Sequence, residues 1–399
     1  MIIKKCEVCE SKDLKKVLNL GLHPLCDDLI KIGSAQNSKL YKIEILFCNK
    51  CFTAHQKYQV NKKILFNKNY HYRARFTNDV LNGMKNLVEE SSKFFSNSRD
   101  KTVLDIGCND GSLLNFFWKK GFRTIGVEPT NAFKDASKKH KIFNNYFDRN
   151  LVNQLKEKKN KIDLICFTNV FAHIENLNAL LRNLKALIDK DTLLIIENHY
   201  LGSILRKNQF DTFYHEHPRT YSLKSFNFIA KKLNVNILKV QFPKRYGGNI
   251  RVILGRRKAK ESKKIFYLIS KEKKFIKDFQ KMNSLIKNWK IKKFNEINKL
   301  YLKNGKLIAK AFPGRAAILI KLLNLNENYI SAVYEKPNSK KIGHYVPGTK
   351  IPILSDNLLF KKIKQRKINI IINLAWHLSK EIKNYLRSKN YKKMIFDIL

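Results

Sequence analysis

The chain has 399 residues and carries 80 lysines and arginines against 32 aspartates and glutamates, a formal charge of +48. A chain of this length is too long to fold around one hydrophobic core of ordinary size, so we predict two or three domains. Although 44% of the residues are hydrophobic, we find no apolar run of the roughly 18 to 20 residues that span a bilayer, and the opening residues lack the apolar stretch of a signal peptide. We therefore expect a cytoplasmic protein without membrane insertion.

The charge allows two interpretations. A strongly basic chain normally indicates a nucleic acid or an anionic membrane as partner. Here the basic residues are mostly lysines spread along the whole chain among abundant asparagine and isoleucine, which is typical of a composition bias. The charge would still attract an anionic substrate such as a nucleotide diphosphate. We expect a monomer with a small-molecule substrate and no nucleic-acid partner.

Residues 1–70 are expected to form a zinc-binding module. Four of the seven cysteines are paired by spacing, as Cys6-x-x-Cys9 and Cys48-x-x-Cys51. Disulfides are rare in the cytosol, whereas two such pairs supply the four thiolates of a closed structural zinc site, which has no open position for catalysis. The 38 residues between Cys9 and Cys48 exceed the gap of a compact zinc ribbon. Four reduced structural thiols are therefore the alternative.

Residues 71–257 are expected to form an α/β domain. Apolar strand-like runs alternate with amphipathic stretches in this region, a pattern that predicts a parallel sheet wound with helices. The predicted strands are 102–106, 124–127, 162–167 and 192–197, with a further strand before residue 148.

The first predicted strand ends in a glycine-rich turn, Asp105-Ile106-Gly107-Cys108-Asn109-Asp110-Gly111. This is the D-x-G-x-G-x-G spacing with asparagine at the middle glycine, and asparagine tolerates left-handed backbone better than most residues. A turn of this kind between a strand and a helix leaves room for a nucleotide-like ligand.

The charged groups of the ligand distinguish a site for a methyl donor from a site for a dinucleotide at such a turn. S-adenosylmethionine has no pyrophosphate but carries a sulfonium, an ammonium and a ribose diol, so its site needs acids. Asp105 is placed for the ammonium, and Glu128, at the end of the second strand, can accept both ribose hydroxyls. We therefore predict a class I Rossmann-like methyltransferase domain that binds S-adenosylmethionine. The expected cofactor residues are Asp105, Gly107, Asn109, Gly111, Glu128, Asp148 near adenine and Asn169 after the fourth strand.

Residues 258–399 are expected to form a second, smaller α/β domain. To about residue 302 the segment is lysine-rich with apolar residues at helical spacing, which predicts an amphipathic helix or helix pair. Beyond it, strands are predicted at 306–311, 329–334 and 368–374 and a helix at 316–323.

The densest cluster of potentially catalytic side chains is Tyr214-His215-Glu216-His217, beyond the fifth strand of the methyltransferase domain. Loops at the carboxyl ends of parallel strands commonly hold substrates. The His-x-His pattern also suggests a metal, although methyl transfer requires none. A structural role for one or both histidines is the other alternative.

Motifs along nearly the whole chain resemble those of one family. They are the two Cys-x-x-Cys pairs, Leu20-Gly21-Leu22-His23-Pro24-Leu25, Tyr70-His71-Tyr72, the turn from Asp105 to Gly111, Tyr214-His215-Glu216-His217, Gly247-Gly248-Asn249-Ile250-Arg251, Pro347-Gly348-Thr349-Lys350-Ile351-Pro352-Ile353 and Leu374-Ala375-Trp376. Together they resemble the sugar C-methyltransferase family, whose best-known members add a methyl to C3 of a dTDP-linked 4-keto-deoxyhexose.

The resemblance implies that His217 is the general base, with Tyr214 and Glu216 assisting. A hydrogen beside a ketone is weakly acidic, and a histidine with an ordinary pKa of about 6.5 removes it only if donors such as a tyrosine hydroxyl stabilise the enolate. The enolate carbon then attacks the sulfonium methyl. The family also implies a tyrosine from Tyr70-His71-Tyr72 at this site. We favour Tyr72 as the catalytic one and place Tyr70 at the substrate, with aromatic packing as the alternative.

The C-terminal domain resembles the family's sugar-nucleotide platform. Its turn at residues 311–317 departs from the family's commoner Tyr-Gly-Ala form, which leaves the nucleotide and the sugar open. Arg315 could meet a diphosphate at a helix start, and His344 and Lys350 could assist, with solvated charge as the alternative for each. The predicted function is C-methylation of a nucleotide-linked keto-deoxysugar.

Two other functions stay open. An O- or N-methyltransferase of a surface-polysaccharide sugar or another small molecule would also use a deprotonating histidine, so only the position of the product's methyl separates it. The charge and the cysteines suggest an RNA methyltransferase. However, Asn169-Val170-Phe171 differs from the Asn/Asp-Pro-Pro-aromatic motif of base amino-methylation, and Cys166 lacks the preceding proline expected of a cytosine nucleophile.

Overall fold

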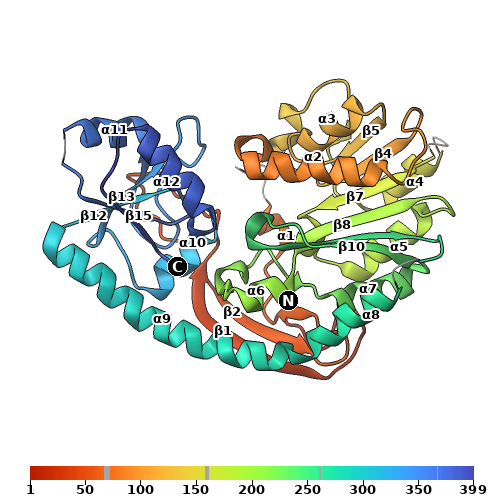
Figure 1. Cartoon of the computed structure of the whole chain (residues 1–399), viewed down its shortest axis with the longest axis horizontal. Coiled ribbons are helices and arrows are strands. Elements are labelled where there is room, and N and C mark those ends of the chain that lie inside the picture. The colour runs from red at the N-terminus through yellow and green to blue at the C-terminus, as the bar shows by residue number, and fades with distance from the viewer. Residues whose placement is uncertain (67–71, 158–160, 260–261, 366) are drawn as a thin grey trace. The chain divides into compact units, whose positions relative to one another are not determined.

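The computed structural model describes residues 1–66, 72–157, 161–259, 262–365 and 367–399 (Figure 1). The chain forms two compact units. The first consists of Met1–Val17, Ile45–Lys207 and Glu216–Asp278, and the second of Leu18–Glu44, Asn208–His215 and Phe279–Leu399.

A small sheet has the strand order β1-β2-β3-β9 in the described residues. Its strands are β1 (Leu14–Pro24), β2 (Leu40–Cys48), β3 (Ala54–Gln56) and β9 (Arg219–Thr220). β2 and β3 form an antiparallel pair in which Phe47 lies opposite Ala54, so the intervening turn holds the second Cys-x-x-Cys pair. β3 also pairs with β9, which begins two residues after His217.

The region predicted to be the methyltransferase domain is built on a sheet of order β10-β11-β8-β7-β4-β5-β6 in the described residues. Its strands are β4 (Thr102–Ile106), β5 (Arg123–Val127), β6 (Lys141–Phe143), β7 (Leu164–Thr168), β8 (Leu193–His199), β10 (Asn236–Gln241) and β11 (Asn249–Gly255). β6, β5, β4, β7 and β8 run parallel, whereas β11 pairs antiparallel with both β8 and β10. The strands predicted at 102–106, 124–127, 162–167 and 192–197 agree with β4, β5, β7 and β8 to within a few residues.

Helices flank this sheet (Figure 1). They are α1 (Lys62–Leu65), α2 (Asn78–Ser92), α3 (Ser112–Lys119), α4 (Arg149–Glu157), α5 (Leu177–Leu187), α6 (Leu201–Arg206), α7 (Leu223–Leu233) and α8 (Ser262–Lys271). Leu87 of α2 and Phe117 of α3 pack with Val103 and Leu164 of the sheet in one buried core. The strand order reverses between β4 and β7, and open α/β sheets bind ligands at the carboxyl ends of the strands at such a point.

The second unit contains a parallel sheet of order β14-β13-β12-β15-β16 within the described residues. Its strands are β12 (Leu307–Lys310), β13 (Ile330–Glu335), β14 (Ile353–Ser355), β15 (Ile370–Asn373) and β16 (Met394–Asp397), with helices α10 (Ala316–Leu322), α11 (Asp356–Lys364) and α12 (Ser379–Ser388). Where the sequence predicted an amphipathic helix or a helix pair, the structure has two helices, α8 and α9 (Phe275–Asn304), separated by the 3-10 turn Glu272–Lys274. Nowhere in the described chain does a helix have the length and apolar character needed to cross a bilayer.

Candidate active site and metal centre

The four predicted metal ligands lie together in the first unit. The sulfur atoms of Cys6, Cys9, Cys48 and Cys51 all lie within 4.8 Å of one another. The Cys6–Cys51 sulfur distance is 3.4 Å and the Cys9–Cys48 distance is 3.5 Å. Four sulfurs at about 2.3 Å from one tetrahedral zinc would be about 3.8 Å apart. The cluster therefore fits a single zinc ion.

A polar network connects this cluster to β9. His55 Nε2 lies 3.3 Å from the Cys6 sulfur, and its Nδ1 lies 3.5 Å from the carboxylate of Glu7. The same carboxylate pairs with Arg219 at 2.8 Å. Burial alone would raise the pKa of Glu7, but Arg219 and His55 outweigh it and lower that pKa to about 2. Arg219 follows His217 by two residues, so the network connects the cysteine cluster to the segment that carries the proposed base.

The glycine-rich turn has the backbone that its sequence predicts. Gly107, Asn109 and Gly111 have φ values of 74°, 51° and 71°, all in the left-handed region. A Cβ atom on Gly107 would come within 2.6 Å of the Val170 side chain. The turn thus requires glycine at 107 both for its conformation and for space.

Two buried acids stand at the carboxyl ends of β4 and β5. Glu128 accepts hydrogen bonds from the backbone amides of Asn109 and Thr130, each at 2.9 Å, and from the Thr130 hydroxyl at 2.6 Å. Burial, together with the negative charge of Glu128, raises the pKa of Asp105 to about 8. The negative charge of each acid disfavours ionisation of the other, and a bound cation would offset this repulsion. The pair therefore suits a cationic ligand such as S-adenosylmethionine.

Binding of S-adenosylmethionine should therefore depend on pH. With a pKa of about 8, Asp105 is largely protonated near pH 6, whereas a cationic donor favours its carboxylate. Binding should release a proton, and affinity should rise by at most about tenfold per pH unit from about pH 6 to 8 and then level off. Calorimetry in buffers of different ionisation enthalpy measures both quantities, and Asp105→Asn should abolish the dependence. Equal affinity at both pH values in the unmodified protein would contradict the assignment.

Asn169 and Asp148 have different surroundings. Asn169 follows β7 with φ of 54°, and its side-chain oxygen accepts a hydrogen bond from Asn249 at 3.2 Å. It therefore lies at the carboxyl edge of the sheet. The Asp148 carboxylate accepts a hydrogen bond from the amide of Leu151 in the first turn of α4. A contact between Asp148 and adenine stays a prediction.

The segment that begins at Tyr72 lies on the glycine-rich turn. The Asn109 side chain donates to the Tyr72 carbonyl at 3.2 Å and accepts from the Ala74 amide at 3.1 Å, while the Arg75 amide donates to Asp110 at 3.0 Å. Tyr72 is thus held at the cofactor end of the sheet. Tyr70 lies outside the described residues.

Five rings form a continuous series at this edge, which we call the His–Tyr row: His173, His217, His199, Tyr246 and Tyr72. The ring centre of His217 lies 4.8 Å from that of His173 and 5.1 Å from that of His199. The His199 ring lies 5.5 Å from that of Tyr246, whose hydroxyl is 2.8 Å from the Tyr72 hydroxyl. The row therefore joins the proposed base to a pair of phenols.

His173 is an uncharged neighbour of the base. Its Nδ1 donates to the backbone carbonyl of Glu216 at 2.7 Å, and burial lowers its pKa to about 4. The Nδ1–H of His173 thus forms a hydrogen bond to the segment that carries His217. Because His173 stays neutral at neutral pH, it adds no positive charge beside a protonated His217.

His199 and Tyr246 are site residues that the sequence motifs do not single out. His199 is the last residue of β8. Its position as a polar residue at the carboxyl end of an apolar strand could have identified it from the sequence. Tyr246 precedes Gly247 and Gly248, and glycine pairs often accompany an unusual backbone. Neither signal indicates which side chains meet in the fold.

Glu197 lies at the centre of a buried ionic network below the row. Its carboxylate binds Arg245 at 2.5 Å, Arg251 at 2.7 Å and the Asn249 side chain at 3.0 Å. Burial alone would raise the pKa of Glu197, but the two arginines hold it below its usual value. Gly83 of α2 leaves space for this network, since a Cβ atom there would lie 2.4 Å from the Arg245 side chain.

The remaining predicted residues belong to the second unit. Arg315 is buried, with Nε 3.0 Å from the Asp211 carboxylate and Nη1 bonded to the Thr212 hydroxyl at 3.2 Å. The alternative of a solvated charge is therefore wrong for Arg315. Lys350 donates to the backbone carbonyls of residues 34 and 36, and half-buried His344 contacts the carbonyl of residue 341. Their roles toward a diphosphate stay predictions.

Tyr214 and His215 also lie in the second unit. Tyr214 is half-buried. His215 donates from Nε2 to the Tyr41 carbonyl at 3.1 Å, and burial lowers its pKa to about 4. These contacts favour a structural role for His215, the first histidine of the motif.

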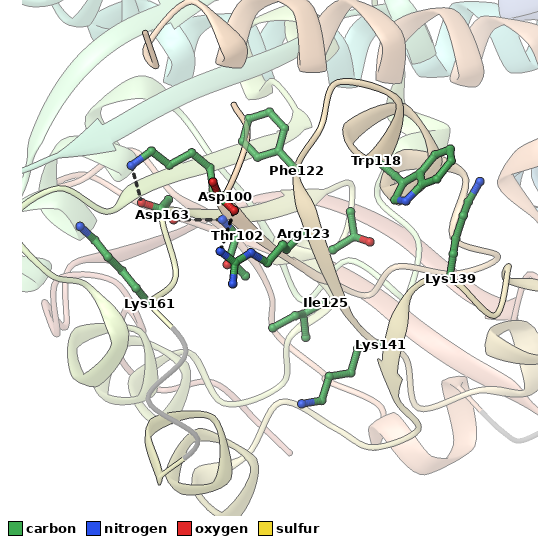
Figure 2. A pocket seen from close by; sticks show the side chains of 12 residues that line it. Asp100, Thr102, Trp118, Phe122, Arg123, Ile125, Lys139, Lys141, Lys161 and Asp163 are labelled. Atoms are coloured by element: carbon green, nitrogen blue, oxygen red, sulfur yellow. Dashed lines mark hydrogen bonds and ion pairs between the residues drawn. The ribbon is translucent and has the colours of Figure 1, made fainter. Parts of the chain in front are cut away.

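A basic cavity of about 570 Å³ lies at the opposite end of the methyltransferase sheet (Figure 2). It is lined by Asp100, Lys101, Thr102, Trp118, Phe122, Arg123, Thr124, Ile125, Lys139, Lys141, Lys161 and Asp163. Thr102 and Arg123 are the first residues of β4 and β5, whereas the two acids lie at the carboxyl ends of these strands. The cavity is thus separate from the proposed donor site and includes none of the predicted site residues.

Three family models match consecutive parts of the chain. A zinc binding domain matches residues 6–66, a methyltransferase domain residues 79–240, and a C-methyltransferase C-terminal domain residues 244–397. The C-methyltransferase NovU of Streptomyces niveus is 25% identical over 251 residues, which cover 62% of this chain and 60% of that relative. The match thus spans less than two thirds of NovU.

Solved methyltransferases resemble part of the chain. A SAM-dependent methyltransferase from Archaeoglobus fulgidus is 17% identical with a TM-score of 0.35, covering 44% of this chain and 93% of its own. Magnesium protoporphyrin IX methyltransferase from Synechocystis PCC 6803 is 16% identical with a TM-score of 0.35, covering 45% and 84%. The three family models in their order and the similarity to NovU support the resemblance predicted from the motifs: the chain has the predicted α/β fold class, with a methyltransferase domain for S-adenosylmethionine and a four-cysteine site for zinc.

Proposed function

We propose that the protein transfers the methyl of S-adenosylmethionine to the carbon beside the ketone of a nucleotide-linked keto-deoxysugar, with His217 as the base. The His–Tyr row is the observation that supports this proposal most directly. It places a buried imidazole and two phenol hydroxyls in one series at the carboxyl edge of the sheet. A ketone that loses a neighbouring proton needs both a base and hydrogen-bond donors at its oxygen.

The donor site would be formed by the glycine-rich turn and the two acids. When bound, S-adenosylmethionine supplies an electrophilic methyl group on a sulfonium. Asp105 would hold the ammonium side and Glu128 the ribose hydroxyls, the latter in exchange for some of its present bonds to Asn109 and Thr130. The left-handed turn at Gly107 keeps side chains away from this space.

The acceptor chemistry would be carried by the chain's own side chains. His217 takes the proton from the carbon beside the ketone, and neighbouring His173 stays uncharged because its pKa is about 4. A tyrosine hydroxyl donates to the ketone oxygen as negative charge develops there. We propose that the C-terminal domain, residues 258–399, binds the nucleotide part through residues including Arg315, His344 and Lys350.

The test is to incubate the protein with methyl-labelled S-adenosylmethionine and a panel of nucleotide-linked keto-deoxysugars, and to locate the label by NMR. A labelled methyl bonded to the carbon beside the ketone is the expected product. A methoxy or N-methyl signal would instead assign O- or N-methylation. Absence of transfer to every sugar, with transfer to RNA, would overturn the proposal.

A further inference from the structure

We infer that Tyr246 is a further catalytic residue, whose hydroxyl acts with that of Tyr72 to bind the acceptor's ketone oxygen and stabilise the enolate. This inference rests on the proposed function and adds the donor group that the base requires. Four observations carry it: the backbone of Tyr246, the network that holds it, its place in the His–Tyr row and the chemistry of enolate formation.

The backbone of Tyr246 is strained. The residue lies in the 3-10 turn Arg245–Gly247, between β10 and β11, with φ of 52° and ψ of 26°. A bulky side chain rarely adopts this left-handed conformation, which favours glycine. The two following residues are glycines with φ of 85° and 132°. A chain that needed only a tight turn here would be more stable with glycine at 246 as well.

Buried contacts on each side hold this conformation. Arg245, immediately before Tyr246, is fixed by Glu197 and by the carbonyl of Val80, 3.2 Å from its Nη1. Gly248 lies so close to α6 that a Cβ atom there would be 2.6 Å from the Ser203 hydroxyl. Strained residues that persist because their surroundings over-determine them cluster at functional sites.

The strain places the phenol in the His–Tyr row. The Tyr246 hydroxyl lies 2.8 Å from the Tyr72 hydroxyl, and the Tyr246 ring packs 5.5 Å from that of His199. His199 in turn lies 5.1 Å from the proposed base, His217. Tyr72 is 38% exposed, so part of this residue at the end of the row is accessible to solvent.

A pair of phenols matches the charge change of the proposed reaction. As the C–H bond breaks, its proton moves to His217 and its electrons delocalise onto the ketone oxygen. One phenol can donate to the other while the second donates to this oxygen, and hydrogen bonds in such a chain polarise one another. The C–C bond to the methyl then forms as the carbon–sulfur bond breaks, and His217 later releases its proton to water.

Tyr246→Phe tests this inference because it removes only the hydroxyl. We expect kcat to fall about 10²- to 10³-fold, as when an oxyanion donor is lost, with little change in the affinity for S-adenosylmethionine. Exchange of the acceptor's hydrogen in D₂O without the methyl donor, with a dTDP-linked 4-keto-6-deoxyhexose as probe, should fall by a similar factor. Tyr267→Phe, at a 57% exposed tyrosine of α8, is the matched control and should change neither rate.

Tyr246→Gly separates a catalytic role from a structural one. Glycine relieves the strained φ but removes a ring that packs against the core, so the unfolding temperature of this variant should change little, while its exchange and turnover fall at least as far as those of Tyr246→Phe. Near-normal turnover in either variant would overturn the inference and leave the proposed function intact. Wild-type protein that neither exchanges nor methylates any keto-sugar would overturn both.

Discussion

Replacing His217 with asparagine should lower kcat by about 10²- to 10⁴-fold, the usual contribution of general acid–base catalysis. The substitution removes the imidazole between His173 and His199 but leaves Asp105, Glu128 and the glycine-rich turn in place. Affinity for S-adenosylmethionine should therefore be unchanged. Single-turnover methyl transfer measures the first quantity and calorimetry the second.

The same variant should also fail to exchange the acceptor's hydrogen with D₂O in the absence of the methyl donor. This readout isolates proton removal from methyl transfer. If His217→Asn turns over normally, another group is the base. If exchange persists while methyl transfer is lost, His217 acts after proton removal, and the proposed mechanism is wrong.

Purified, reduced protein should contain one zinc ion per chain, and Cys48→Ser should lose it. Structural zinc sites in small domains supply about 10–16 kcal/mol of apparent binding free energy, which is also folding free energy. We therefore expect the variant to lose hydrogen-exchange protection in β2 and β3. Mass spectrometry of metals and of deuterium uptake measures both effects.

Cys26→Ser is the matched control for the zinc prediction. Cys26 is also a buried cysteine, but it lies in the second unit and outside the four-sulfur cluster. This variant should keep one zinc ion. A Cys48→Ser protein with full zinc content would contradict the assignment of Cys48 as a zinc ligand.

Local patterns were sufficient to predict the centre of the methyltransferase sheet. Thr102 to Ile106 is an apolar run that ends at glycines, and both the buried strand and the left-handed turn follow from these few residues. The cysteine cluster was equally predictable, because the two thiolates of a Cys-x-x-Cys pair can bind one metal ion from a single tight turn. Residues close in sequence carry both signals.

Other features depend on contacts between distant segments. Nothing near Tyr246 in the sequence shows that it meets Tyr72, because the contact requires β10, β11 and the segment before α2 to converge. Similarly, Arg315 has the sequence context of an exposed helix start, yet Asp211, about 100 residues earlier, balances its charge in the interior. A pattern read along the chain detects the side chain but not its partner.

The network from Cys6 through His55 and Glu7 to Arg219 has a consequence for oxidative damage. Of the four cluster cysteines, Cys9 is partly exposed and the other three are buried, and accessible thiolates oxidise first. An oxidant would thus reach the cluster through Cys9 and loosen the contacts that hold Arg219, two residues after His217. Inactivation could then begin at a sulfur that takes no part in methyl transfer, and a reductant together with zinc would be needed to reverse it.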